Sequence, residues 1–218
     1  MALFEIITGD CHEVLKGLET GSIDAIVTDP PYGMNYKCDS TRFSGGNGSN
    51  RRQSQGVKWP RILNDNKPFD PAPWLDWKKV IMFGVNHFGE KLPVGTTLVW
   101  IKRNEPAYGT FLSDAELAWM KGGHGVYCFK DTSYQASNQR FHPTTKPIPL
   151  MRWCIKKLKL KPGATILDPF CGSGSTGVAA IREGFNFIGI EAVPAYSEIA
   201  KRRCENELAM IKAETHAN

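Results

Sequence analysis

The chain has 218 residues, of which 41% are hydrophobic, and a formal net charge of +5 at pH 7. This length suits one domain with a substantial core, and the modest positive charge permits a polyanionic partner without requiring one. No apolar run approaches the length needed to cross a membrane, and the first residues lack the basic region and cleavage site of a signal peptide. We therefore expect a cytoplasmic protein that has no membrane partner.

The six cysteines are Cys11, Cys38, Cys128, Cys154, Cys171 and Cys204. None of them forms a Cys-x-x-Cys pair, so we expect no structural metal and no zinc site. In a cytoplasmic protein, cysteines are expected to be reduced, and most of them are expected to be buried.

The first half of the chain alternates short apolar runs with polar segments. Its pattern predicts a helix over residues 10–18 and strands over residues 3–8, 23–28, 80–84 and 96–101. Residues 33–73 are rich in Gly, Ser, Asn and Arg and show no sustained period. A segment this long without periodicity is uncommon inside a compact domain unless it is functional or disordered. We predict that residues 33–73 form a long mobile loop at the substrate.

The second half of the chain continues the alternation. Ser113-Asp114-Ala115-Glu116 has the spacing of a capping box and predicts a helix that continues through Met120. The remaining pattern predicts strands over residues 125–130, 165–167 and 185–190 and helices over residues 147–158, 176–183 and 195–211. Repeated alternation implies an α/β fold with a mostly parallel sheet and helices on both faces. Residues 1–218 show no repeat and no linker, so a single domain is predicted.

A glycine-rich turn follows the predicted strand at 165–167. It reads Asp168-Pro169-Phe170-Cys171-Gly172-Ser173-Gly174, and its glycines let the backbone approach a ligand closely. The following helix start offers free N–H groups, and Glu191 at the end of the next strand can accept both hydrogen bonds from a ribose diol. Gly172-x-Gly174-x-x-Gly177 also matches the dinucleotide fingerprint, so an NAD site remains an alternative for this turn alone.

A second turn, Asp29-Pro30-Pro31-Tyr32, follows the predicted strand at 23–28 and should lie at the carboxyl edge of the sheet. The two prolines fix the backbone and remove N–H donors, which leaves carbonyl oxygens and a carboxylate as hydrogen-bond acceptors. An exocyclic amine supplies two N–H donors, and Tyr32 adds a flat face on which a ring can stack. The turn therefore has the features of a receptor for an aromatic amine.

The two turns together resemble the amino-methyltransferases of DNA. That family places Asp-Pro-Pro-Tyr at the target amine and an Asp-Pro-Phe-x-Gly-Ser-Gly turn at S-adenosylmethionine. In its beta group the catalytic motif precedes the cofactor motif, as in this chain. His142-Pro143-Thr144-Thr145-Lys146-Pro147 and Thr8-Gly9-Asp10-Cys11 match two further family segments, and the stretch at 114–119 is similar to small phage and prophage members.

The resemblance implies a Rossmann-like, S-adenosylmethionine-dependent methyltransferase sheet with its motifs in permuted order. It also implies a concrete reaction on double-stranded DNA, in which the target base is flipped out of the duplex. Tyr32 would stack on the base, while Asp29 and the Pro30 carbonyl, held by the rigid Pro30-Pro31 pair, would accept the hydrogens of the amine. Direct in-line transfer follows, and much of the rate would come from positioning and preorganised acceptors.

The resemblance also implies a set of cofactor contacts. Glu191 would bind the ribose, Asp10 and Cys11 would lie at the adenine edge, and Thr144 and Lys146 would approach from the adjacent loop. Cys171 is expected to pack within the turn rather than to act as a nucleophile. The predicted cofactor set is Asp10, Cys11, Asp29, Thr144, Lys146, Asp168, Phe170, Cys171, Gly172, Ser173, Gly174, Thr176 and Glu191.

Basic residues in two places are candidates for DNA contact, because they can meet phosphates while neighbouring aromatic groups stack on bases. The first group is interleaved with Phe43 and Trp59 and comprises Lys37, Arg42, Arg51, Arg52, Lys58 and Arg61. The second group follows a predicted strand and comprises Lys102 and Arg103. Lys201-Arg202-Arg203 is interpreted as the solvated face of the last helix. The chain leaves little room for a separate target-recognition domain, so recognition falls to the 33–73 loop or to a second subunit, and a homodimer stays open.

The identity of the target base rests on the first residue of the catalytic motif. Asp-Pro-Pro-Tyr is the commoner adenine form in the family, so N6-adenine methylation is the first hypothesis and cytosine-N4 methylation the alternative. A non-catalytic DNA-binding module that keeps the cofactor fold is a further alternative. An NAD oxidoreductase ranks below these, because it has no use for the Asp-Pro-Pro-Tyr turn.

Overall fold

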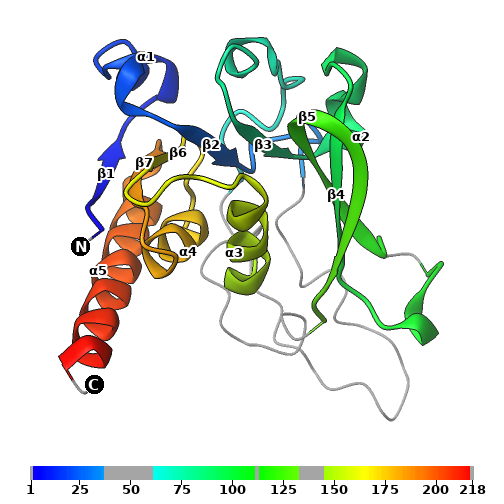
Figure 1. Cartoon of the computed structure of the whole chain (residues 1–218). Helices are drawn as coiled ribbons and strands as arrows, with labels where there is room; N and C mark the ends of the chain where they lie inside the picture. Colours follow the sequence, from blue (N-terminus) through cyan, green and yellow to red (C-terminus); the bar gives the residue numbers. More distant parts are fainter. Residues whose placement is uncertain (1, 37–60, 111–112, 133–144, 217–218) are drawn as a thin grey trace, which may run out of the picture.

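The computed structural model describes residues 2–36, 61–110, 113–132 and 145–216. Its sheet has seven strands in the order β1-β7-β6-β2-β3-β5-β4 (Figure 1). The parallel part contains β1 (Phe4–Thr8), β7 (Asn186–Glu191), β6 (Thr165–Asp168), β2 (Ala25–Thr28) and β3 (Val80–Phe83). The remaining strands are β4 (Gly95–Ile101) and β5 (Ala115–Lys130). The predicted α/β fold with a mostly parallel sheet is confirmed.

The helices are α1 (Cys11–Leu15), α2 (Val85–Phe88), α3 (Ile148–Lys157), α4 (Ser175–Arg182) and α5 (Pro194–His216), and short 3-10 turns occur at Thr20–Ser22, Ala72–Trp74, Gly89–Lys91 and Glu105–Ala107. Four of these five α-helices of the described residues, α1, α3, α4 and α5, lie close to predicted helices, whereas the short helix α2 was not predicted. Helix α1 begins where Asp10 accepts hydrogen bonds from the N–H groups of His12 and Glu13, at 2.9 and 3.3 Å. No helix in the described part of the chain is long and apolar enough to cross a membrane.

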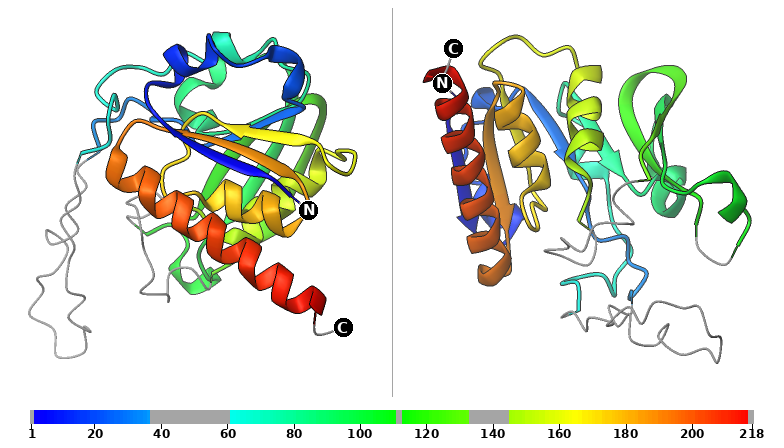
Figure 2. Two further views of the ribbon diagram at one scale, coloured as in Figure 1. Left: turned by 90° about the vertical axis from the view of Figure 1, so that its left-hand side faces the viewer. Right: turned by 90° about the horizontal axis from the view of Figure 1, so that it is seen from below.

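The sheet separates two apolar layers. Ala25, Val27 and Ile81 pack with α3, α4 and α5 on one face, and Figure 2 shows these three helices side by side. Ile26 and Val80, which alternate with those residues, point into the opposite layer with α1 and the 3-10 turn around Trp74. Both faces of the central strands are therefore buried, which explains why these strands are almost continuously apolar in sequence.

The helix predicted over residues 113–120 is wrong, because this segment begins the long strand β5. The Ser113 hydroxyl donates to the carbonyl of Ala115 at 2.7 Å, so it does not cap a helix. Ala118 and Trp119 then point into opposite apolar layers, as neighbouring residues of a strand do. Pairing with β3, in antiparallel register from Ile81↔Met120 to Phe83↔Ala118, overrides the local helix signal.

Strand β5 turns back on itself and encloses β4. Its first half pairs with β4 in antiparallel register, from Gly95↔Lys121 to Ile101↔Ala115. Gly122 and Gly123 then take positive φ angles of 84° and 68°, which glycine adopts readily. The second half runs along the other side of β4 from Thr97↔Val126 onward, which agrees with the strand predicted over 125–130.

Candidate active site

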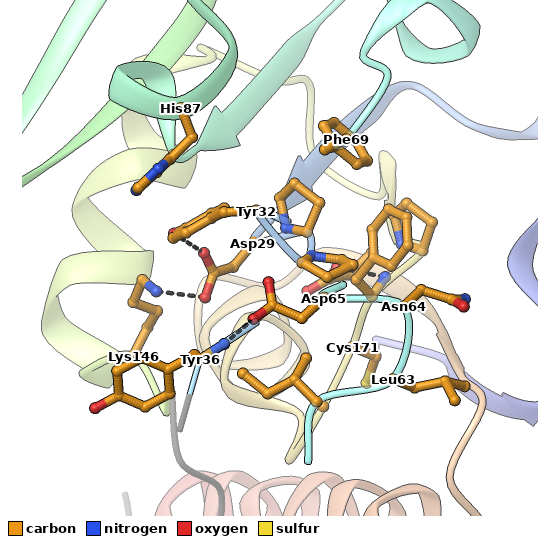
Figure 3. A pocket seen from close by; sticks show the side chains of 18 of the residues that line it. Asp29, Tyr32, Tyr36, Leu63, Asn64, Asp65, Phe69, His87, Lys146 and Cys171 are labelled. Carbon is orange, nitrogen blue, oxygen red and sulfur yellow. Dashed lines mark hydrogen bonds and ion pairs between the residues drawn. The ribbon is translucent and has the colours of Figure 1, made fainter. Parts of the chain in front are cut away.

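The two turns singled out in the sequence meet at one edge of the sheet. Strands β2 and β6 are parallel neighbours, so the segments that follow Thr28 and Asp168 leave the sheet on the same side. The Thr28 hydroxyl donates to Oδ1 of Asp168 at 2.7 Å and joins the two strand ends directly. Both turns line one cavity of about 1270 Å³, part of which is drawn in Figure 3.

Asp29 lies on the cavity wall and its carboxylate has two partners. The Tyr32 hydroxyl donates to Oδ1, and the Lys146 ammonium donates to Oδ2 (Figure 3). The side chains of Asp29 and Lys146 are only 16% and 7% exposed, so this ion pair is largely removed from water. Lys146, which was predicted to contact the cofactor, also lines the cavity, and its ammonium is directed to the other turn.

The Lys146 ammonium has a second carboxylate partner that the sequence did not identify. Glu116 Oε2 lies 3.2 Å from Lys146 Nζ, and Glu116 Oε1 accepts a hydrogen bond from Lys102 at 2.8 Å. Burial alone would raise the pKa of Glu116, but Lys146 and Lys102 lower it to about 2. The carboxylate of Glu116 is therefore charged at neutral pH.

The same environment shifts the pKa of the groups around Asp29. Burial raises the pKa of Asp29, and the attraction of Lys146 opposes that rise. Burial disfavours the charged form of Lys146, yet Asp29 and Glu116 hold its pKa well above the usual range. Burial and the nearby Asp29 raise the pKa of Tyr32, so its hydroxyl remains a donor.

The ring of Tyr32 is held in a fixed orientation. It stacks on His87, with ring centroids 4.8 Å apart and an angle of 14° between the planes. Gly84 has a φ of 94°, and any side chain there would overlap the Tyr32 ring. Gly84 directly precedes α2 and His87 lies within it, so this short helix supports the aromatic part of the turn.

The glycine-rich turn approaches the cavity from the other side. The N–H groups of Gly172 and Val193 each donate to one oxygen of Glu191, both at 2.8 Å. The predicted cofactor residues that line the cavity are Asp10, Cys11, Asp29, Lys146, Asp168, Phe170, Cys171, Gly172, Ser173, Thr176 and Glu191. Gly174 is not among the lining residues, and it packs against Ala200 of α5. Thr144 lies outside the described residues.

The carboxylate of Asp168 is held in place by three hydrogen-bond donors. It accepts hydrogen bonds from the hydroxyls of Thr28 and Thr176 and from the N–H of Phe170, at 2.7, 2.6 and 3.1 Å. Burial raises the pKa of Asp168 to about 6, although these three donors act in the opposite direction. Asp168 therefore ties β2, β6 and α4 together at the cavity wall.

The buried thiols are poor nucleophiles. Burial raises the pKa of Cys171 well above the usual range, and burial together with Asp10 raises the pKa of Cys11 to about 12. Cys171 is buried within its turn, where its sulfur lies next to Gly189. This packing agrees with the expectation that Cys171 is not a nucleophile.

The predicted DNA-contacting residues are only partly within the described chain. Arg61 and Lys102 line the cavity, and Lys102 is paired there with Glu116. Arg103 donates to the Thr110 hydroxyl at 2.6 Å, outside the cavity lining. The other five residues lie outside the described ranges, so their roles stay predictions: Lys37, Arg42, Arg51, Arg52 and Lys58.

Two further residues, Asp65 and Arg203, support the turns, and the sequence analysis did not identify this role for either of them. Asp65 is 4% exposed and accepts the N–H groups of Gly33, Met34 and Tyr36 at 2.9, 3.3 and 2.7 Å, which fastens the chain just after Tyr32 (Figure 3). No local pattern marks this loop aspartate in the sequence.

Arg203 corrects the interpretation of the basic run on the last helix. It donates to the carbonyl and hydroxyl of Ser173 at 2.5 and 3.0 Å and braces the glycine-rich turn, whereas Lys201 and Arg202 are exposed as expected. Helical spacing could have identified it, because Arg203 follows Ala200 by three residues and adjoins Cys204, both of which are buried.

Comparison with known proteins is consistent with this geometry. A family model for N6/N4 methylases, described as DNA methylase, matches residues 95–202. YubD of Escherichia coli (strain K12) is 29% identical over 203 residues, covering 90% of this chain and 88% of that protein. The type II methyltransferase M2.MboI of Moraxella bovis is 26% identical over 254 residues, covering 97% and 91%.

Two solved structures share the fold. The M1.HpyAVI–SAM complex matches with a TM-score of 0.59 at 23% identity, covering 92% of this chain and 100% of that one. The cytosine-N4-specific PvuII DNA methyltransferase matches with a TM-score of 0.60 at 14% identity, covering 93% and 86%. At these identities the likeness establishes the architecture of the sheet and its helices.

Proposed function

Because the chain belongs to the N6/N4 amino DNA methyltransferase family, we propose that it methylates the exocyclic N6 of an adenine flipped out of double-stranded DNA. The coarser activity is that of a DNA amino methyltransferase that uses S-adenosylmethionine. The choice of adenine rests on Asp29 as the first residue of the Asp-Pro-Pro-Tyr turn. Cytosine N4 is the second candidate, since the PvuII enzyme of that specificity shares the fold.

The residues on the glycine-rich side of the cavity fit S-adenosylmethionine. Two backbone N–H groups hold the Glu191 carboxylate at the cavity wall, where its remaining lone pairs can accept from the two ribose hydroxyls. Asp10 and Cys11, just after β1, line the same cavity and would lie at the adenine. When bound, S-adenosylmethionine supplies a methyl group attached to a positively charged sulfur.

The residues on the other side of the cavity would receive the target base. Tyr32 offers an aromatic ring held in place by His87 and Gly84, and a flipped base would stack against it. Asp29 keeps unused acceptor positions on a carboxylate that already binds Tyr32 and Lys146. An amine that donates to Asp29 and to the Pro30 carbonyl would turn its nitrogen lone pair toward the methyl group.

The observation that carries the proposal is the convergence of Asp29 and Glu191 on one cavity. They come from opposite ends of the chain, and the Thr28–Asp168 hydrogen bond fixes the strand ends next to them. An acceptor for an aromatic amine and a carboxylate for a ribose are both needed for methyl transfer from a nucleoside cofactor to a base. A non-catalytic module would need only the second of these.

The test is methyl transfer to unmethylated DNA by the wild type, by Asp29→Ala and by the exposed control Asp76→Ala, with the modified base identified by mass spectrometry. We expect N6-methyladenine from the wild type and the control, and a rate at least about a hundredfold lower in Asp29→Ala, because a preorganised acceptor is lost. N4-methylcytosine would overturn the choice of base. A wild type that binds S-adenosylmethionine and DNA without methyl transfer would overturn the activity.

A further inference from the structure

A row of four alternating charges runs from Asp29 along the cavity wall. Asp29 pairs with Lys146, Lys146 with Glu116 at 3.2 Å, and Glu116 with Lys102 at 2.8 Å. All four residues line the cavity, and the exposed fractions of the Glu116 and Lys102 side chains are 30% and 21%. The row therefore belongs to the site, although the sequence analysis did not assign Glu116 to it.

The position of Glu116 is set by strand pairing. Glu116 lies opposite Trp100 in the β4–β5 register, so it sits near Lys102, which follows β4. Lys146 reaches the same point from the segment before α3, and its ammonium lies 5.1 Å from the centre of the Phe83 ring. Three separate parts of the chain thus bring one buried ammonium between two carboxylates.

Resting on the proposed function, we infer that Glu116 is a positioning residue that shares the Lys146 ammonium with Asp29 and so leaves Asp29 free to accept hydrogens of the target amine. Without Glu116, Asp29 would be the one carboxylate paired with Lys146 among the residues that the structure describes, and the ammonium would bind it more closely. A closer ammonium draws electron density from the carboxylate and competes for its lone pairs. Lys102 in turn holds Glu116 in place.

The row acts by charge and geometry and does not carry protons. The pKa of Glu116 is lowered to about 2, and the pKa of Lys146 is raised well above its usual range. A proton passed from Asp29 along the row would have to leave Lys146 for Glu116, against a large difference in proton affinity. Both groups therefore stay charged throughout the neutral range.

The effect of Glu116 on Asp29 has a defined sign. The negative charge of Glu116 raises the pKa of Asp29, so its removal lowers that pKa, and a closer Lys146 lowers it further. Loss of the Lys102 charge frees Glu116 to draw Lys146 away, and the pKa of Asp29 then rises. Among the described residues, the elements that pack against this row contribute four other titratable groups, which are Tyr32, His87, Cys154 and Asp168.

The two variants Glu116→Gln and Lys102→Met test this inference by shifting the pH profile in opposite directions. Methylation is followed from about pH 5 to pH 9 at saturating DNA and over a range of S-adenosylmethionine concentrations, so both kcat and the KM for S-adenosylmethionine are measured. In Glu116→Gln we expect kcat to fall about tenfold and the KM for S-adenosylmethionine to stay within about twofold. The acidic limb of the plot of kcat against pH should move to lower pH by about 0.5 unit or more, because the pKa of Asp29 falls. In Lys102→Met the acidic limb should move to higher pH, because the pKa of Asp29 rises.

Glu183→Gln is the matched control, because Glu183 is also a poorly exposed carboxylate between two cations, Arg152 and Lys156, but lies away from the cavity. We expect it to keep the wild-type pH profile. An acidic limb that stays in place in both test variants, or moves the same way in both, would overturn the role of Glu116. Methylation by the wild type and by Glu183→Gln would show in the same experiment that the proposed function itself stands.

Discussion

Glu191 offers two oxygens to the cavity, and each already accepts one backbone N–H at 2.8 Å. The donors are Gly172, in the glycine-rich turn, and Val193, just before α5. A ribose can therefore bind to a carboxylate whose orientation is fixed before the cofactor arrives. A glutamine in this place would turn its amide nitrogen toward one of the two N–H groups, which creates a donor–donor conflict.

At this residue we predict that Glu191→Gln weakens S-adenosylmethionine binding. The dissociation constant should rise between about tenfold and a hundredfold, as expected for the loss of hydrogen bonds to a charged group. Isothermal titration calorimetry measures it directly, with the exposed Glu198→Gln as the control on α5. An unchanged dissociation constant in Glu191→Gln would place the ribose elsewhere in the cavity.

Helix α4 is framed by two glycines that share one backbone conformation. Gly174 precedes the helix and Gly184 follows it, and both have a φ of +80°. Their surroundings differ, because a Cβ at Gly174 would lie 2.9 Å from the Cα of Ala200, whereas nothing lies within 4 Å at Gly184. The first glycine therefore sets how closely α5 packs on the glycine-rich turn, and Arg203 braces the same contact.

This pair of glycines separates backbone strain from packing. Gly184→Ala should lower the free energy of unfolding by about 1 kcal/mol, the usual cost of a left-handed conformation for alanine. Gly174→Ala should lower it by about 1 to 3 kcal/mol more, because α5 must also move. Urea unfolding of both variants gives the difference, and equal losses would mean that α5 does not constrain the turn.

Across the whole molecule, two apolar layers enclose a sheet that buries several ionisable groups at one edge. One of these is Asp168, which is 2% exposed and whose pKa is raised to about 6 by burial. The folded protein thus holds a proton on Asp168 more tightly than the unfolded chain, whose aspartates titrate near pH 4. Ionisation of Asp168 therefore destabilises the fold as the pH rises from about 4 to about 6.

The stability of the whole molecule should show this titration when Asp168→Asn is compared with the wild type. The free energy of unfolding of the wild type, minus that of Asp168→Asn, should fall by about 2 to 3 kcal/mol between pH 4 and pH 7. Subtraction removes the groups common to both proteins, such as Glu116, whose lowered pKa acts in the opposite direction. Urea unfolding at each pH gives the values, and Asp76→Asn, at an exposed position, is the control. A flat difference for Asp168→Asn would contradict the raised pKa.

Much of the molecule follows from local patterns in the chain. Apolar runs such as 23–28 predict strands because both faces of a parallel sheet are buried, and the following Asp-Pro-Pro-Tyr and glycine-rich turns predict ligand contacts at its carboxyl edge. The predicted fold class is confirmed. The family model over residues 95–202 agrees with the predicted DNA amino methyltransferase family, and the use of S-adenosylmethionine belongs to the proposed function. The phage origin, the single domain, the homodimer and the DNA contacts stay predictions.

The tertiary structure alone decided how distant residues meet. The segment at 113–120 carries a helix signal, but the open edge of β3 pairs with it and turns Glu116 toward Lys146. The Lys146–Asp29 pair joins residues 117 positions apart. Such contacts depend on the order and register of strands, which no local pattern encodes. The sequence by itself determined which chemical groups are present and on which strand ends they lie, and long-range packing determined which of them touch.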